Sequence, residues 1–380
     1  MRKNICELCS SISDTYKGNA EKVVLINTSD VYDGKCTNHT LVENKQLRGQ
    51  FKKTFKPNDI LYSEIRPANR RFAYIDFDTK NYIASTKLMV LRAKEGVSPK
   101  YLYQILRGNS TINALQLLAE SRSGTFPQIT FSELSNIEVN IPSEDVQNMV
   151  VSILSSLDAK IETNNKLNEK LEEMAQAIFK SWFVDFEPFK NQPFYETELG
   201  MIPEGWEVKT VDEFCRIFTG KKNTNQSDAN GIYPFFSCAP DPLRSNDYLY
   251  DGYAVIIAGN GSYTGRTQLY NGKFDLYQRT YACVAKEKFF NDKIVFIYLM
   301  MKHGFEREKM GGTRGSSIPY IVMNDIAKQT FCYNKNVIGN FCNIVRPVMD
   351  FKHKLQIESA RLASLRDTLL PRLMSGEIKI

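Results

Sequence analysis

The sequence predicts an α+β protein in which two globular domains alternate with two long helices, paired antiparallel as a coiled coil. Three observations indicate this arrangement. A heptad-spaced seam runs through residues 147–189, a second seam occupies the C-terminal stretch, and a short motif recurs ahead of both. The repetition of motif and helix in the same order predicts a pseudo-two-fold internal repeat.

The first seam is the clearest pattern in the chain. Its members are spaced alternately four and three residues apart, which is the a/d spacing of a coiled-coil helix. They are Val150, Leu154, Leu157, Ile161, Asn164, Asn168, Leu171, Ala175, Ile178 and Trp182. Pro188 ends the pattern. The two asparagines could fix the register of the pairing at some cost in stability.

A helix this long in a soluble chain needs a partner along its seam. The C-terminal stretch offers one, because similar spacing recurs there in Val348, Phe351, Leu355, Glu358, Leu362, Leu365 and Leu369. Pro347 would occupy the first turn of this second helix, where a missing N–H is tolerated.

The motif ahead of each helix consists of an arginine, a proline five residues later and an isoleucine two residues after that. It occurs at Arg122 and again at Arg314. Chance similarity between two amphipathic helices is the alternative, but it does not explain why the motif and the helix recur together.

These patterns divide the chain into four parts. Residues 1–145 and 190–336 form the globular domains, and residues 146–189 and 337–380 form the long helices. A segment rich in Pro and Gly, residues 191–206, marks the start of the second globular domain.

Composition indicates a folded protein with room for two cores. The chain has 380 residues, of which 42% are hydrophobic and 12% aromatic. No apolar run approaches the roughly 20 residues that a membrane span needs, and no secretory signal follows Met1. The eight cysteines are scattered, so we expect reduced thiols and a cytoplasmic location.

The positive charge lies outside the helices. The net charge is +6, whereas residues 148–185 hold four lysines against six acids and residues 341–377 hold six basic residues against four acids. The charges of the two helices therefore cancel, and the excess positive charge lies on the globular domains. Such an excess suits an anionic partner such as nucleic acid.

The first globular domain mixes strands and helices. Strands are predicted at 23–26, 59–62, 72–77 and 83–91, and helices at 100–107 and 112–118. Arg66, Arg70 and Arg71 surround a Pro-Asn turn, where guanidinium groups could contact phosphates or guanine edges. Arg122 sits at a similar joint. A solvated loop and a plain hinge are the alternative interpretations.

In the second globular domain, strands are predicted at 233–238 and 254–258. The candidate DNA-binding residues are Lys221, Lys222, Tyr263, Arg266, Arg279 and Arg314. Tyr263 and Arg266 lie in a Gly-rich loop whose glycine spacing differs from the dinucleotide-binding pattern. An ordinary turn between strands is the alternative for this loop.

The sequence offers no catalytic constellation. It has no phosphate-binding loop of the nucleotide hydrolases, no methyltransferase tetrapeptide, and only three histidines, none near another in sequence. Cys6 and Cys9 lack the second ligand pair that a zinc site needs. We therefore predict no catalytic residues and no metal site, and interpret the chain as a binding scaffold.

Three segments resemble those of specificity subunits of type I restriction–modification systems. Residues 157–186 resemble their central conserved region, and residues 365–378 resemble their distal conserved region. Residues 198–206 resemble the usual opening of their second recognition domain, although the first domain lacks this opening.

The resemblance implies two target-recognition domains, each reading one half of a split site in double-stranded DNA, with the paired helices as the ruler between them. Two methyltransferase subunits carrying S-adenosylmethionine would dock on the helices and methylate a flipped adenine. Restriction and translocase subunits would use ATP and Mg²⁺, and this chain would bind no cofactor. Helix–helix and subunit contacts are predicted for Phe179, Trp182, Phe183, Phe186, Leu369 and Leu370.

Two alternatives stay open at this point. One is an S-like subunit that serves a fused methyltransferase–nuclease restriction enzyme. The other is a coiled-coil adaptor whose globular domains bind protein rather than DNA. DNA binding through several Lys and Arg contacts should weaken steeply with salt, which separates the adaptor from the other two.

Overall fold

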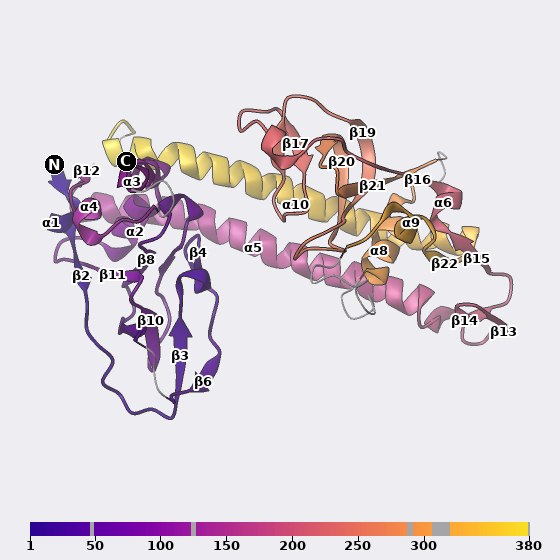
Figure 1. Cartoon of the computed structure of the whole chain (residues 1–380), viewed down its shortest axis with the longest axis horizontal. Helices are drawn as coiled ribbons and strands as arrows, with labels where there is room; N and C mark the ends of the chain where they lie inside the picture. The colour runs from indigo at the N-terminus through magenta and orange to yellow at the C-terminus, as the bar shows by residue number, and fades with distance from the viewer. Residues whose placement is uncertain (46–48, 123–126, 287–291, 306–319, 379–380) are drawn as a thin grey trace. The chain divides into compact units, whose positions relative to one another are not determined.

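The computed structural model describes residues 1–45, 49–122, 127–286, 292–305 and 320–378 (Figure 1). The chain forms two compact units. Unit 1 comprises Met1–Thr163 with Glu358–Ile380, and unit 2 comprises Asn164–Ile357. Two long helices, α5 (Glu144–Phe183) and α10 (Lys335–Ser375), each contribute one segment to each unit. At 1.5 Å per residue each helix is roughly 60 Å long.

The globular part of unit 1 is built from short strands and short helices. Its strands are β1 (Arg2–Asn4), β2 (Cys9–Ile12), β3 (Lys22–Ile26), β4 (Val31–Tyr32), β5 (Lys35–Cys36), β6 (Leu41–Glu43), β7 (Phe51–Lys53), β8 (Ile60–Ser63), β9 (Phe72–Tyr74), β10 (Tyr82–Ser85), β11 (Leu88–Ala93) and β12 (Glu138–Asn140). Its helices are α1 (Ile5–Leu8), α2 (Pro99–Arg107), α3 (Asn109–Arg122) and α4 (Phe131–Ser135), with 3-10 turns η1 (Thr28–Asp30) and η2 (Pro67–Asn69).

Two four-stranded sheets, β6-β3-β10-β7 and β2-β11-β8-β9, share a core in unit 1. Side chains alternate between the two faces of a strand. Leu61 of β8 joins a core with residues of β3 and β10, whereas Ile60 and Tyr62 join a core with helix α2. Val150 and Leu154 of α5, and Leu370 and Leu373 of α10, belong to that second core.

The prediction of one strand over residues 83–91 is wrong. A turn at residues 86–87 separates β10 from β11, and the two strands belong to different sheets. Both strands are apolar because each borders a core. Only three polar residues, Ser85, Thr86 and Lys87, mark the turn between them, and a prediction from apolar content passes over so short a break.

Unit 2 contains strands β13 (Phe194–Thr197), β14 (Gly200–Pro203), β15 (Glu207–Thr210), β16 (Cys215–Thr219), β17 (Tyr233–Phe236), β18 (Leu243–Ser245), β19 (Tyr250–Ala258), β20 (Thr267–Leu276), β21 (Thr280–Ala285) and β22 (Thr330–Tyr333). Its shorter helices are α6 (Val211–Phe214), α8 (Ile294–Gly304) and α9 (Met323–Ala327), with 3-10 turns η3 (Glu187–Phe189) and η4 (Thr224–Gln226).

A six-stranded sheet, β16-β21-β19-β20-β17-β18, separates two cores of unit 2. Val255 and Ile257 of β19 face a core that includes the buried helix α8 and segments of α5 and α10. Ala254 and Ile256 face the other core, with Phe236 and Phe274. Because side chains alternate between the two faces of β19, one face of the sheet packs on α8 and on the long helices.

The seam predicted on α5 is confirmed. Val150, Leu154, Asn164, Asn168 and Ala175 are buried, and the other predicted seam positions are half-buried. The helix starts three residues before Gln147 and ends at Phe183, ahead of Pro188. Phe186 and Phe189 follow outside the helix, and Phe189 lies in the 3-10 turn η3.

The two helices run antiparallel within each unit. In unit 1 Asp158 pairs with Arg366, and the earlier Leu154 shares a core with the later Leu370. In unit 2 Glu172 pairs with Lys352, and Phe183 packs on Phe341 at 5.1 Å between ring centroids. The α+β class with two long paired helices is thereby confirmed.

The seam predicted on α10 is partly wrong. Phe351 and Leu365 are 46% and 48% exposed. The positions that face α5 instead include Lys352 and Arg366, which pair with carboxylates of α5. An apolar criterion assigns such charged residues to the surface, so it selects the wrong stripe of the helix.

Pro347 does not begin α10. The helix starts at Lys335, and the side chain of Asn334 accepts hydrogen bonds from the backbone N–H groups of Asn336 (3.1 Å) and Val337 (3.2 Å). This asparagine cap sets the start. Pro347 therefore lies inside the helix, where its ring removes one backbone donor.

Candidate nucleic-acid interface

Several loops of unit 2 meet at one place beside the six-stranded sheet. The N–H of Gln278 donates to the carbonyl of Lys222 (3.1 Å), and that of Gly259 donates to the carbonyl of Arg279 (2.9 Å). The N–H of Tyr277 donates to the carbonyl of Phe236 (2.9 Å). These bonds join the loops that follow β16, β17, β19 and β20. We call residues 220–223, 237–240, 259–266 and 277–279 the loop cluster.

Glycine is required where these loops approach most closely. A Cβ at Gly220 would lie 1.6 Å from the carbonyl oxygen of Leu276, and Gly261 has a φ of +84°. A larger residue at either position would clash or be strained. The Gly-rich character of the 259–265 stretch thus serves backbone packing in the loop cluster.

The loop cluster contains the predicted unit 2 residues that the structure describes. Tyr263 is 46% exposed, and Lys221 and Arg279 are exposed as well. An aromatic ring and two cations on neighbouring loops are suited to stacking and to phosphate contact. Arg314 lies outside the described residues.

Arg266 is committed to the protein itself. Its guanidinium donates to the carbonyls of Ala239 (2.8 Å) and Pro240 (2.6 Å), and burial lowers its pKa from the usual value. Arg266 therefore holds the 259–266 loop against the 237–240 loop. Its guanidinium group serves the shape of the loop cluster.

Lys222 is likewise paired. Its ammonium lies 2.7 Å from the carboxylate of Asp275 and 3.0 Å from that of Asp247, and the hydrogen bond to Asp275 raises its pKa. Asp275 is buried, so this ion pair anchors the start of the loop to β20.

Sequence reasoning missed Asn223 and Asn260, two amide side chains in the loop cluster. Gln278 donates to the side-chain oxygen of Asn223 (2.6 Å), and Asn260 accepts from the thiol of Cys238 (3.0 Å). Amides read base edges well. No signal in the sequence marks them, because their proximity arises from how the strands bring distant loops together.

In unit 1 the predicted arginines flank the 3-10 turn η2. Arg66 and Arg70 adopt left-handed backbone conformations, with φ of +44° and +53°. Such conformations in non-glycine residues are costly, and they cluster at functional sites. The N–H of Arg66 donates to the carbonyl of Pro127 (3.0 Å), which ties the turn to the segment after α3.

Arg70 and Arg71 contact other residues of unit 1 through their guanidinium groups. Arg70 donates twice to Asp33 (3.0 and 2.8 Å) and once to Asn109 (3.1 Å). Arg71 donates to the carbonyl of Ser29 (3.0 Å), and its guanidinium lies 5.4 Å from the ring centre of Tyr32. Arg122 is the last residue of α3. The structure thus gathers Arg66, Arg70 and Arg71 on one loop.

The residues predicted for helix and subunit contacts are mostly interior. Phe179, Phe183 and Phe186 are buried in the core of unit 2, and Leu370 is buried in that of unit 1. Phe183 packs edge-on against Phe296 at 4.8 Å between centroids. Trp182 and Leu369 are half-buried. These side chains fasten the globular domains to the long helices.

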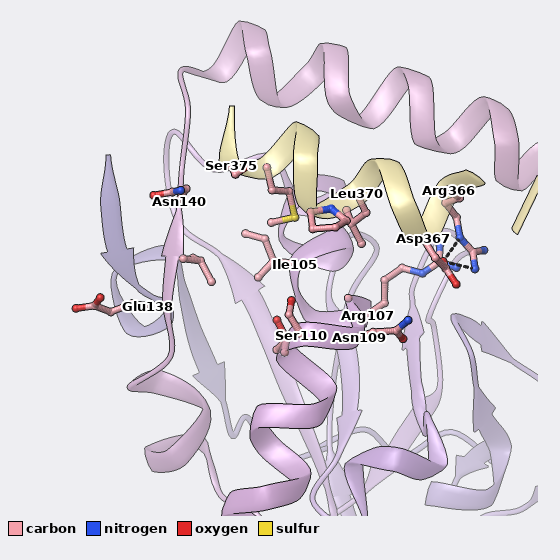
Figure 2. Close-up of a pocket in the computed structure, with 15 residues that line it drawn as sticks. Ile105, Arg107, Asn109, Ser110, Glu138, Asn140, Arg366, Asp367, Leu370 and Ser375 are labelled. Atoms are coloured by element: carbon pink, nitrogen blue, oxygen red, sulfur yellow. Dashed lines mark hydrogen bonds and ion pairs between the residues drawn. The ribbon is translucent and has the colours of Figure 1, made fainter. Parts of the chain in front are cut away.

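Unit 1 also has a pocket of about 260 Å³ beside the C-terminal turns of α10 (Figure 2). Ile105 and Leu370 form apolar parts of its wall, and Arg107, Arg366 and Asp367 lie along one side. Asn109 and Ser110, at the start of α3, also line the pocket and are labelled in Figure 2.

Within the described ranges, no group of three or more His, Cys, Asp or Glu side chains is arranged to hold a metal ion. No described helix combines the length and apolar character that crossing a membrane requires.

Comparison with known proteins assigns the family. The family model described as "Type I restriction modification DNA specificity domain" matches residues 3–173 and 203–332. The specificity subunit of the type I restriction enzyme HindI of Haemophilus influenzae is 30% identical, over 98% of both chains. The MjaIX specificity subunit of Methanocaldococcus jannaschii is 29% identical, over 76% of this chain and 71% of its own.

A solved structure shares the fold. The S subunit of a type I restriction–modification system from M. genitalium superimposes with a TM-score of 0.52 at 16% identity, covering 98% of this chain and 96% of that one. The adaptor and the S-like subunit of a fused enzyme are not favoured by these matches. This chain belongs to the family of type I restriction–modification specificity subunits, with two target-recognition domains.

Proposed function

We propose that each globular domain reads one half of a split DNA site and that the paired helices set the distance between the halves. One observation carries this proposal. Each compact unit joins one globular domain to one segment of each of the same two helices. Two modules on a shared helical support match a target made of two blocks separated by a fixed gap.

The loop cluster of unit 2 and the η2 loop of unit 1 are the surfaces proposed to meet DNA. The exposed Lys221, Tyr263 and Arg279 support the first, and the exposed Arg66 beside η2 supports the second. Arg70, Arg266 and Lys222 would hold these loops in shape, since their own charged groups already have protein partners.

The helices are also proposed to dock two methyltransferase subunits. In unit 2, Leu167 and Met174 of α5 and Ile344 and Phe351 of α10 are exposed large apolar residues. On each helix the two are seven residues apart, so they lie on one face. Helices of a partner could cover such faces, whereas the aromatic residues near Phe183 are already buried.

Catalysis belongs to the partners in this proposal. The methyltransferase subunits would bind S-adenosylmethionine, and the restriction and translocase subunits would bind ATP and Mg²⁺. This chain would supply recognition without catalysing a reaction, and the assembled complex would act on double-stranded DNA in the cytoplasm. The two-domain organisation of a specificity subunit supports this division of labour.

Exchange of one domain tests the proposal. Residues 1–145 are replaced by the corresponding domain of another specificity subunit, and the methylated motif is determined by sequencing. We expect one half of the motif to change and the other half to persist. Exchange of residues 190–336 is the matched experiment and should change the other half. If either exchange altered both halves, or neither, the two-domain assignment would fail.

A further inference from the structure

A carboxylate of α5 in unit 1 is shared by two arginines from two different elements. Asp158 accepts from Arg107, the last residue of α2, at 2.6 Å through one oxygen. It accepts from Arg366 of α10 at 2.8 Å through the other oxygen. Arg107 is buried, and Figure 2 shows both arginines reaching the same side of the pocket from α2 and α10. The globular domain and both long helices thus meet at one acid.

Unit 2 has the same arrangement with lysines. One oxygen of Glu172 on α5 lies 2.7 Å from the ammonium of Lys302 on α8, and accepts a hydrogen bond from Tyr298 at 2.6 Å. The other oxygen pairs with Lys352 of α10. Glu172 is 8% exposed. Lys302, like Arg107 in unit 1, lies near the C-terminal end of a helix of the globular domain.

We infer that Asp158 and Glu172 are positioning residues that fix the angle of each recognition domain on the helical pair, and thereby the DNA spacer that the protein accepts. This inference rests on the proposed function. We call the two clusters the domain locks. Each contains an arm to the globular domain (Arg107 or Lys302) and an arm to α10 (Arg366 or Lys352).

The geometry explains why the locks would act on orientation. Apolar attraction is non-directional, so the cores fix the angle of a domain on the helices only through the shapes of the packed side chains. A carboxylate that accepts from two sides allows only a narrow range of positions for both donors. Buried ion pairs often contribute little net stability, and fixing one arrangement is a role attributed to several of them.

The two arms can be separated by mutation. Lys302→Met and Arg107→Met remove the domain arm and retain the apolar stem. Lys352→Met and Arg366→Met remove the helix arm. Glu173→Gln is the matched control, because Glu173 lies beside Glu172 on α5 but is exposed and pairs with Lys170 only on the surface. Each variant is assembled with its modification subunits and tested on a DNA library with graded spacer lengths.

We expect the domain-arm variants to methylate sites whose spacer is one base pair longer or shorter roughly tenfold more than the wild type does, which corresponds to about 1.4 kcal/mol of lost preference between spacers. Both half-site sequences should stay the same. Glu173→Gln should behave as wild type. A uniform fall in methylation at all spacers, or an unchanged spacer preference, would overturn the inference.

A charge-retaining variant covers the case of poor folding. Glu172→Asp keeps the negative charge and withdraws the carboxylate by one methylene, so the lock is loosened without leaving lysines unpaired. It should broaden the spacer preference to a smaller extent, and an unchanged single spacer would again contradict the inference. If the wild type itself methylated no split motif, the proposed function would fail instead.

Discussion

At the residue scale, Glu172 is the most strongly perturbed acid of the domain locks. Burial alone would raise its pKa, but Lys352 and Lys302 outweigh burial and lower the pKa from 4.5 to about 2. Tyr298 and Gln176 also donate to it. A carboxyl group with a lowered folded-state pKa stabilises the protein above its unfolded pKa and loses that effect as pH falls toward the folded value.

The direction of this pKa shift gives the first prediction. Glu172→Gln should lower the free energy of unfolding by about 3 kcal/mol at pH 7, from 1.36 kcal/mol per pKa unit. The difference from wild type should shrink between pH 5 and pH 2, as the wild-type carboxylate loses its advantage. Urea unfolding of the full chain across this range is the measurement, with Glu173→Gln as control. A difference that stayed constant with pH would contradict the assignment.

Asn168 gives the second prediction. It is 8% exposed, and its side-chain oxygen has no hydrogen-bond partner within the described part of the chain. An orphaned buried acceptor is destabilising. Asn168→Leu should therefore raise the free energy of unfolding by about 1 kcal/mol, whereas the exposed Asn165→Leu should change it by less than about 0.5 kcal/mol. A loss of stability in Asn168→Leu would show that the oxygen is satisfied.

Sequence reasoning selected charged loop residues but could not assign their partners. Arg70 pairs with Asp33 and Lys222 pairs with Asp275, which are distant in sequence. A local pattern shows that a loop is basic. Whether each charge meets DNA or an internal carboxylate depends on which strands become neighbours, and that information is not local.

At the element scale, periodicity predicted α5 correctly and α10 only in part. The inner apolar stripe of α5 follows the heptad spacing and is broken by Asn164 and Asn168. α10 has an inner stripe that includes Lys352 and Arg366 and an exposed stripe that includes Phe351 and Leu365. Apolar spacing cannot distinguish a stripe that pairs within the chain from one left for a partner.

The third prediction uses that exposed stripe. Phe351→Glu should change the free energy of unfolding by less than about 0.5 kcal/mol, because the side chain is already exposed. It should weaken binding of the modification subunit at least tenfold, since a charge would replace a central apolar contact. Sedimentation of the mixed subunits measures this, with Lys354→Glu, at another exposed position of α10, as control. Undiminished assembly would remove Phe351 from the docking face.

At the scale of the whole molecule, the order of domain and helix was predictable from the repeated motif and the two seams. How the domains attach to the helices was not. The compact units divide α5 after Thr163 and α10 after Ile357, because each domain packs on its own helical segments through α2 or α8. The four parts predicted from the sequence follow secondary structure instead, so they treat each long helix as separate from the globular domains. The four predicted boundaries stay a prediction.

The fourth prediction concerns the ruler. Deleting one heptad from each long helix shortens the pair by roughly 10 Å at 1.5 Å per residue. That length corresponds to about three base pairs at 3.4 Å per pair. We expect the methylated spacer to shorten by about this amount, or methylation to be lost, with both half-sites unchanged. Sequencing of methylated DNA measures the spacer length. An unchanged spacer would refute the claim that the paired helices set it.

The central claim is that this chain determines a split methylation motif. The most direct measurement is methylation-sensitive sequencing of DNA from cells with and without the gene, with its modification subunit present. We expect adenine methylation in two short blocks separated by a fixed gap, and only when the gene is present. Gene-independent methylation, or a motif of one continuous block, would contradict it.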